Sequence, residues 1–72
     1  MKFVNAIRKV ARPLGLLNAD GSLKKIDSLD MINLIVAVEE LTGVSVPAAS
    51  LREEAFESVE SLSALLEQFA EK

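Results

Sequence analysis

The sequence predicts a small all-α protein, a four-helix bundle built from three main helices and one short helix. Apolar residues recur at helical spacing in separate segments, and turn and capping residues divide those segments. Half of the 72 residues are hydrophobic, which suits a packed core and argues against disorder. A chain of this length forms one small domain, so we expect residues 1–72 to fold as a single unit.

The first helix is expected over residues 2–12, where apolar residues lie on one face. These are Phe3, Val4, Ile7, Val10 and Ala11. Pro13 should end this helix, because proline pushes the preceding residue away from helical geometry. The connection over residues 14–26 has a turn signal at residues 18–21, yet it is too apolar for a solvated loop. We therefore expect five of its residues to fold back across the core: Leu14, Leu16, Leu17, Leu23 and Ile26.

The strongest helical pattern covers residues 28–42. Four of its apolar residues should face the core: Met31, Leu34, Ile35 and Val38. Three more form a second stripe at positions i, i+3 and i+7: Leu29, Ile32 and Val36. Such a helix is either central in its bundle or keeps an apolar strip for a ligand or partner. Because burial on all sides is difficult in so small a domain, we favour a strip for a partner.

The remainder of the chain predicts a link and two further helices. Gly43 suits the position just after a helix, and residues 44–47 read as an extended link. Ser50 and Glu53 have capping-box spacing, which predicts a short helix over residues 51–56. Ser58 is the expected N-cap of a final helix. One face of that helix is apolar, with Val59, Leu62, Leu65, Leu66 and Phe69.

The composition argues against several functions. The chain has no Cys and no His, so it lacks the thiol, the commonest metal ligand and the usual general base. We therefore expect neither an enzyme nor a metal site. Glu39 and Glu40 interrupt the longest apolar run, and residues 1–17 lack the apolar stretch of a secretory signal. The expectation is a cytoplasmic protein without membrane insertion.

The formal net charge of −3 conceals a division along the chain. Residues 1–25 contain six basic and one acidic residue, whereas residues 26–72 contain two basic and ten acidic ones. An acidic body is a poor nucleic-acid binder and a plausible target for basic partner surfaces. Pairing of the basic segment with the acidic helices inside the molecule explains the pattern equally well.

The tetrapeptide from Asp27 to Asp30 marks the most informative site, at the start of the long helix. Ser28 places a hydroxyl at a helix N-terminus, where backbone N–H groups and the helix dipole favour a phosphate. Asp27 is the expected cap, which would hold the Ser28 hydroxyl outward. The alternative is that either residue only caps the helix, since Asp-Ser is a common helix start.

Four sets of residues together resemble the acyl carrier proteins, and the resemblance covers about residues 23–69. Similarity to that family's second helix and the loop after it is found in the tetrapeptide, residues 34–40 and Val46-Pro47. Similarity to the junction between its third and fourth helices is found in Phe56, Val59 and Leu62. The resemblance implies that Ser28 carries a covalent 4′-phosphopantetheine arm, whose thiol holds acyl groups as thioesters. It also implies a set of residues that partner enzymes recognise: Asp27, Leu29, Asp30, Ile32, Val36 and Glu39.

The function implied by this resemblance is that of a monomeric acyl carrier without catalysis of its own. Its partners would be a phosphopantetheinyl transferase and enzymes such as ligases, ketosynthases or acyltransferases. Lys24, Lys25 and Asn33 depart from the family pattern, which suggests a specialised fatty-acid, lipid or polyketide pathway. The space between the second and last helices is a hypothetical shelter for an acyl chain.

Two alternatives remain open at this point. One is a peptidyl or D-alanyl carrier, which would load amino-acid thioesters on the same serine. The other is an unmodified helical interaction module, in which the second stripe docks a partner helix in a groove.

Overall fold

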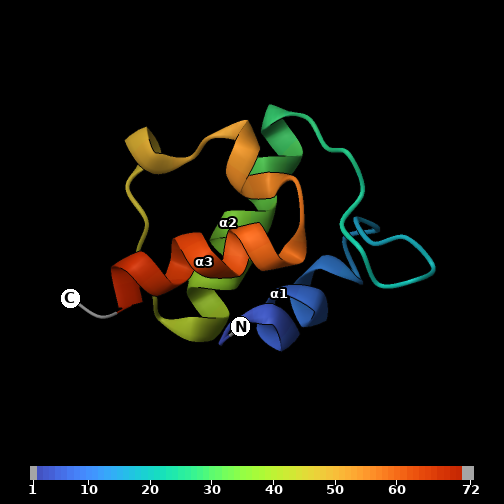
Figure 1. Ribbon diagram of the computed structural model, residues 1–72, viewed down its shortest axis with the longest axis horizontal. Helices are drawn as coiled ribbons and strands as arrows, with labels where there is room; N and C mark the ends of the chain where they lie inside the picture. Colours follow the sequence, from blue (N-terminus) through green and yellow to red (C-terminus); the bar gives the residue numbers. More distant parts are fainter. Residues whose placement is uncertain (1, 71–72) are drawn as a thin grey trace.

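Three α-helices and two short 3₁₀ turns enclose one apolar core in the computed structural model, which describes residues 2–70 (Figure 1). In chain order the elements are α1 (Val4–Ala11), α2 (Ser28–Thr42), η1 (Ala48–Ser50), η2 (Glu53–Phe56) and α3 (Val59–Ala70). The described residues contain no strand, only an isolated β-bridge between Leu17 and Leu23. The predicted all-α class, with three main helices, is confirmed.

Helix α1 is shorter than the predicted range of 2–12 at both ends. Phe3 is the N-cap and lies outside the helical region, with φ −108° and ψ 7°. At the other end, residues 12–15 form a turn in which the Gly15 N–H donates to the Arg12 carbonyl at 3.0 Å. Gly15 has φ +74°, a left-handed conformation that glycine adopts without steric cost. Ile7 and Ala11 are fully buried, so α1 packs through its apolar face.

The N-terminus of α1 is capped by side chains of α3 rather than by its own residues. The Phe3 N–H donates to the Ser63 hydroxyl at 3.0 Å, and that hydroxyl donates to Glu67 at 3.3 Å. Ser63 is completely buried, and it is the one buried polar residue in the described chain. This bond joins residues 60 positions apart in the sequence, so it ties the start of α1 to α3.

Residues 16–24 form a small hairpin that folds back over the core. The Lys24 N–H donates to the Leu16 carbonyl at 2.8 Å, and the Asn18 N–H donates to the Ser22 carbonyl at 2.8 Å. Leu16 and Leu23 are buried, as predicted, but Leu14 is 45 % exposed, so the prediction was wrong for that residue. Leu14 belongs to the turn after α1, before the chain reaches the core.

Polar contacts fix the tip of this hairpin. Hydrogen bonds from the Ser22 hydroxyl and backbone N–H lower the pKa of Asp20. On the α1 side, Arg8 donates through Nε to the Gly21 carbonyl at 3.0 Å and approaches Glu60 of α3 at 3.8 Å. Arg8 therefore connects the hairpin to both neighbouring helices.

Helix α2 spans the predicted residues and ends as the sequence indicates. Gly43 adopts φ +75°, and its N–H donates to the Glu39 carbonyl at 2.8 Å. This left-handed residue closes the helix, because glycine has no Cβ to oppose it. Leu34, Ile35 and Val38 are buried against the other helices, and Met31 is half-buried.

The segment between α2 and α3 differs from the prediction of one short helix over residues 51–56. It contains η1 and η2, separated by Leu51 and Arg52 in extended conformation. Ser50 lies inside η1, and neither turn has a side-chain cap bond, so the capping-box prediction was wrong. The Ser58 hydroxyl does accept the Ser61 N–H at 2.9 Å, which confirms Ser58 as the cap of α3.

We predict that Ser63→Ala destabilises the protein by about 1–3 kcal/mol, because it leaves the buried Phe3 N–H without an acceptor. Urea unfolding, followed by helical circular dichroism, measures the loss. Ser45→Ala is the matched control, since Ser45 is exposed in the link after α2, and we expect a change within about 0.5 kcal/mol. Equal stability of the two variants would contradict the role given to Ser63.

Candidate functional site

Ser28 is the first residue of α2, and residues 2 and 70 lie near the opposite end of that helix. Its side chain is exposed, and its hydroxyl makes no hydrogen bond to any described residue. The first N–H groups of an α-helix have no partner inside the helix, and they create a positive field at that end. A free hydroxyl in this field can accept a phosphate group, provided that another residue caps the helix.

Asp27 is that cap, as predicted. Its carboxylate accepts the Asp30 N–H at 2.9 Å, and its carbonyl accepts the Met31 N–H at 3.0 Å. Asp27 itself is extended, with φ −89° and ψ −179°. Asp30 is half-buried in the first turn, where the helix dipole favours a negative charge. The capping role therefore falls on Asp27, and the hydroxyl of Ser28 remains available.

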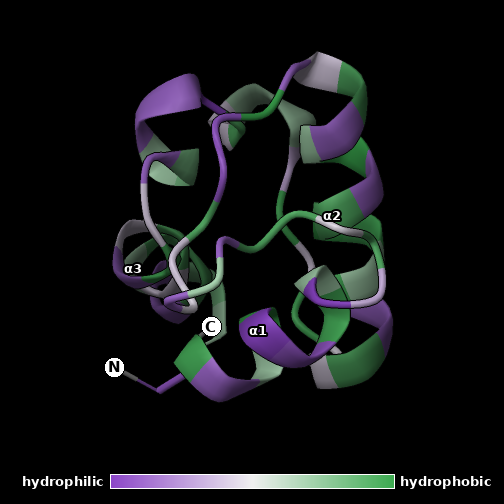
Figure 2. Cartoon of the chain, turned by 90° about the vertical axis from the view of Figure 1, so that its right-hand side faces the viewer, coloured by the Kyte–Doolittle hydropathy of each residue, from purple (hydrophilic) through white to green (hydrophobic). Residues whose placement is uncertain are grey.

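The second stripe lies on the outer face of α2, away from the core. Its three residues are the most exposed large hydrophobic side chains of that helix: Leu29 at 66 %, Ile32 at 52 % and Val36 at 46 %. Figure 2 shows apolar bands interrupted by polar ones along α2. The helix thus buries one apolar face and presents another beside Ser28. A lateral apolar strip of this kind is typical of a surface that contacts a partner.

Glu39 has a structural bond that the sequence pattern did not predict. Its carboxylate accepts the Val46 N–H at 2.7 Å, and the residue is half-buried. This bond holds the link after α2 against the helix. The sequence gives little indication of this bond, because an acidic residue on a helix does not by itself predict that its carboxylate accepts a backbone N–H seven residues later.

A lysine-lined cleft of about 430 Å³ opens beside the N-terminal end of α2. Its lining comes from the end of the hairpin, the first turn of α2 and the η2 region: Leu23, Lys24, Lys25, Ile26, Met31, Glu53, Phe56 and Glu57. Leu23 and Phe56 are buried and form its apolar floor, whereas the lysines and glutamates are exposed. Sequence reasoning missed this cleft, because its walls lie about thirty positions apart in the chain.

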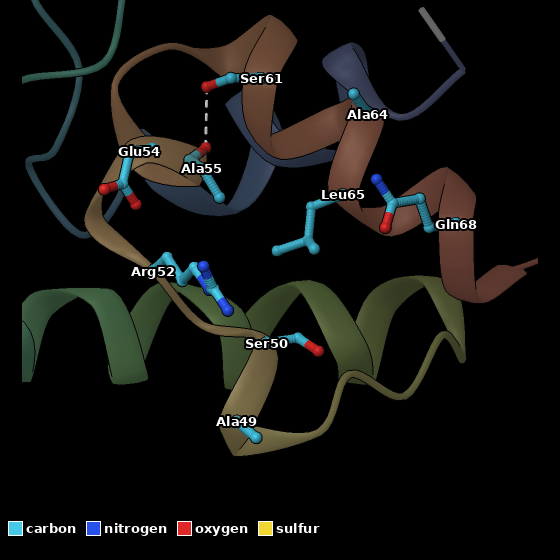
Figure 3. Close-up of a pocket in the computed structure, with 9 residues that line it drawn as sticks. All are labelled: Ala49, Ser50, Arg52, Glu54, Ala55, Ser61, Ala64, Leu65 and Gln68. Atoms are coloured by element: carbon cyan, nitrogen blue, oxygen red, sulfur yellow. Dashed lines mark hydrogen bonds between the residues drawn. The ribbon is translucent and has the colours of Figure 1, made fainter.

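A second cavity, of about 480 Å³, lies between the segment of η1 and η2 and helix α3 (Figure 3). Figure 3 shows Leu65 of α3 pointing toward this space, with Arg52 and Ser50 facing it from the other side. No residue of α2 lines it, so it is separate from the Ser28 site. Leu34 and Val38 of α2 and Leu62 and Leu66 of α3 are fully buried in one core cluster. An acyl chain could enter there only if the helices separated.

Residues 2–70 contain neither a metal-binding cluster nor a helix suited to cross a membrane. No group of three or more acidic side chains there is placed to hold a metal ion. None of the helices in that range combines the length and the apolar character needed to cross a membrane.

The chain matches the family model of the phosphopantetheine attachment site over residues 2–66. That range includes α1, α2, both 3₁₀ turns and more than half of α3. Comparisons with curated proteins and with solved structures find no match.

We predict that Asp27→Ala lowers the free energy of unfolding by about 1 kcal/mol, because the Asp30 N–H loses its acceptor. Asp27→Asn keeps a side-chain oxygen at this position and should change stability by only a few tenths of a kcal/mol. Urea unfolding of the two variants and the wild type distinguishes these outcomes. An equal loss in both variants would show that the negative charge, and not the hydrogen bond, matters here.

Proposed function

The chain belongs to the family of phosphopantetheine attachment site proteins, and we propose that Ser28 is the residue to which its 4′-phosphopantetheine is attached. Members of this family carry this group covalently and act as carriers rather than as enzymes. One observation carries the assignment to Ser28. It combines an exposed, unbonded hydroxyl with the N-terminus of the longest helix of the described chain.

Other serines lack this combination. Ser22 is exposed, but its hydroxyl donates to Asp20 at 2.6 Å. Ser45 is exposed in the link that follows α2, where no helix begins. Ser58, Ser61 and Ser63 are at least half-buried and hydrogen-bonded.

The residues around Ser28 fit a phosphodiester. Asp27 satisfies the Asp30 N–H, while the N–H groups of Ser28 and Leu29 stay unpaired within the helix and favour an anion. When bound, the group supplies a thiol that forms thioesters with cargo. The protein positions this arm and presents it to other enzymes, which perform the chemistry.

We further propose that partner enzymes dock on the second stripe, with Asp27, Asp30 and Glu39 as its acidic border. Carrier proteins of this family interact with a phosphopantetheinyl transferase and with acyl-handling enzymes. A stripe of three exposed apolar side chains next to Ser28 gives such enzymes an apolar contact near the attachment point. The carboxylate of Glu39 also accepts the Val46 N–H, so only the part of this half-buried side chain that faces solvent can contact a partner.

The proposed cargo is an acyl group of a specialised fatty-acid, lipid or polyketide pathway in the cytoplasm, carried by residues 1–72 as one domain. Lys24, Lys25 and Asn33 support specialisation, since all three are exposed near Ser28 or along the second stripe. They replace part of the acidic surface that a basic enzyme surface would attract.

We predict that incubation with coenzyme A and a broad-specificity phosphopantetheinyl transferase adds the mass of one phosphopantetheinyl group. Ser28→Ala should abolish this gain, whereas Ser45→Ala, which removes another exposed hydroxyl, should leave it unchanged. Intact-mass spectrometry reads both results. An unchanged wild-type mass, or an adduct that persists in Ser28→Ala, would refute the assignment.

We predict that Val36→Asp lowers kcat/KM of the same transferase for the carrier at least about tenfold, equivalent to roughly 1.4 kcal/mol. The reason is that a carboxylate in the second stripe must lose its water when a partner covers it. Leu14→Asp is the matched control, because Leu14 is 45 % exposed and Val36 is 46 % exposed, but Leu14 lies outside α2. Initial rates at low carrier concentration measure the effect. Equal losses in the two variants would argue against docking on the second stripe.

A further inference from the structure

We propose that Lys24 and Lys25 bind the phosphodiester on Ser28 and thereby direct the arm into the lysine-lined cleft. This inference rests on the proposed function, because it requires the arm to be attached to Ser28. It assigns the cleft a ligand class: an anionic phosphodiester followed by a chain of amide and apolar groups.

The position and freedom of the two lysines are the first argument. They lie four and three residues before Ser28, in a segment without helix or strand, and both side chains are exposed. Arg8 and Glu60 form the only ion pair among residues 2–70, so neither lysine has an acidic partner. Two unpaired ammonium groups beside the attachment point are therefore available to an anion.

The shape and polarity of the cleft are the second argument. Both lysines line it, together with Ile26 and Met31, which lie two residues before and three residues after Ser28. An arm attached to Ser28 thus reaches the cleft at its near edge. By contrast, the cavity in Figure 3 contains no residue from α2 or from the segment that precedes it.

The cleft has positive charge on one side and negative charge on the other, which is the third argument. Lys24 and Lys25 form one wall, and Glu53 and Glu57 belong to the other. A phosphodiester is attracted to the lysine wall and repelled by the glutamate wall, so it should remain near Ser28. The lysines also offset the negative charges of Asp27 and Asp30, which would otherwise oppose a further anion at this end of α2.

The floor of the cleft suits the rest of the arm. Leu23 and Phe56 are 6 % and 4 % exposed, so they present a fixed apolar surface at its base. The apolar part of the arm can cover this floor, while its amides stay at the exposed rim. In this arrangement the arm rests on the protein between visits to partner enzymes.

The experiment compares apo and holo protein by ¹H–¹⁵N NMR, with the holo form made by the transferase and checked by mass. In the wild type we expect attachment to shift the backbone signals of Leu23, Met31 and Phe56. Lys24→Gln with Lys25→Gln should reduce these shifts by more than half. Raising the salt concentration from about 0.05 to about 0.5 M on the wild-type protein should reduce them in the same direction, because salt screens exposed charges.

The matched control is Lys9→Gln with Arg12→Gln, which removes two exposed cations of the α1 region and changes the net charge equally. It should leave the shifts at the cleft intact. Shifts confined to residues next to Ser28 in the wild type, or an equal loss in the control, would overturn the proposal. Failure of the proposed function is distinct, because the protein would then gain no mass.

Discussion

The fold depends on the burial of one face of α2 in the core that it shares with α1 and α3. Leu34 and Val38 are fully buried and Ile35 is 3 % exposed, while Leu62 and Leu66 of α3 and Ile7 of α1 complete the same core. This packing fixes the rotation of α2 about its axis, because a helix that buries one face must turn the opposite face outward. The exposure of the second stripe follows from that constraint.

Sequence reasoning predicted α2 well because its limits are set locally. Asp27 caps one end through its own side chain, and Gly43 closes the other through its left-handed backbone. The exposed stripe and the cap of α3 at Ser58 were also predictable from spacing and residue type. The Ser28 hydroxyl is available because Asp27, and not Ser28, caps the N-terminus of α2.

Sequence reasoning failed where distant residues decide the outcome. The start of α1 depends on Ser63, which is 60 positions away, and no pattern near Phe3 indicates that partner. The capping-box spacing at Ser50 predicted a helix, but the extended conformation of Leu51 and Arg52 divides the segment into two turns. The lysine-lined cleft forms only when the hairpin and η2 approach each other. The basic first part and the acidic second part of the chain form few ion pairs with each other. Residues 2–70 contain only the contact between Arg8 and Glu60.

The bond between Phe3 and Ser63 joins the start of the described chain to its last helix, α3. Lys2, Gly43 and Ala70 all line one cavity of about 510 Å³, so both ends gather at the C-terminal end of α2. Ser28 occupies the opposite end of that helix (Figure 1). A tether, label or second protein fused beyond these ends would therefore lie far from Ser28. Immobilisation through these ends should leave the N-terminal end of α2 and the proposed attachment site at Ser28 open to solvent.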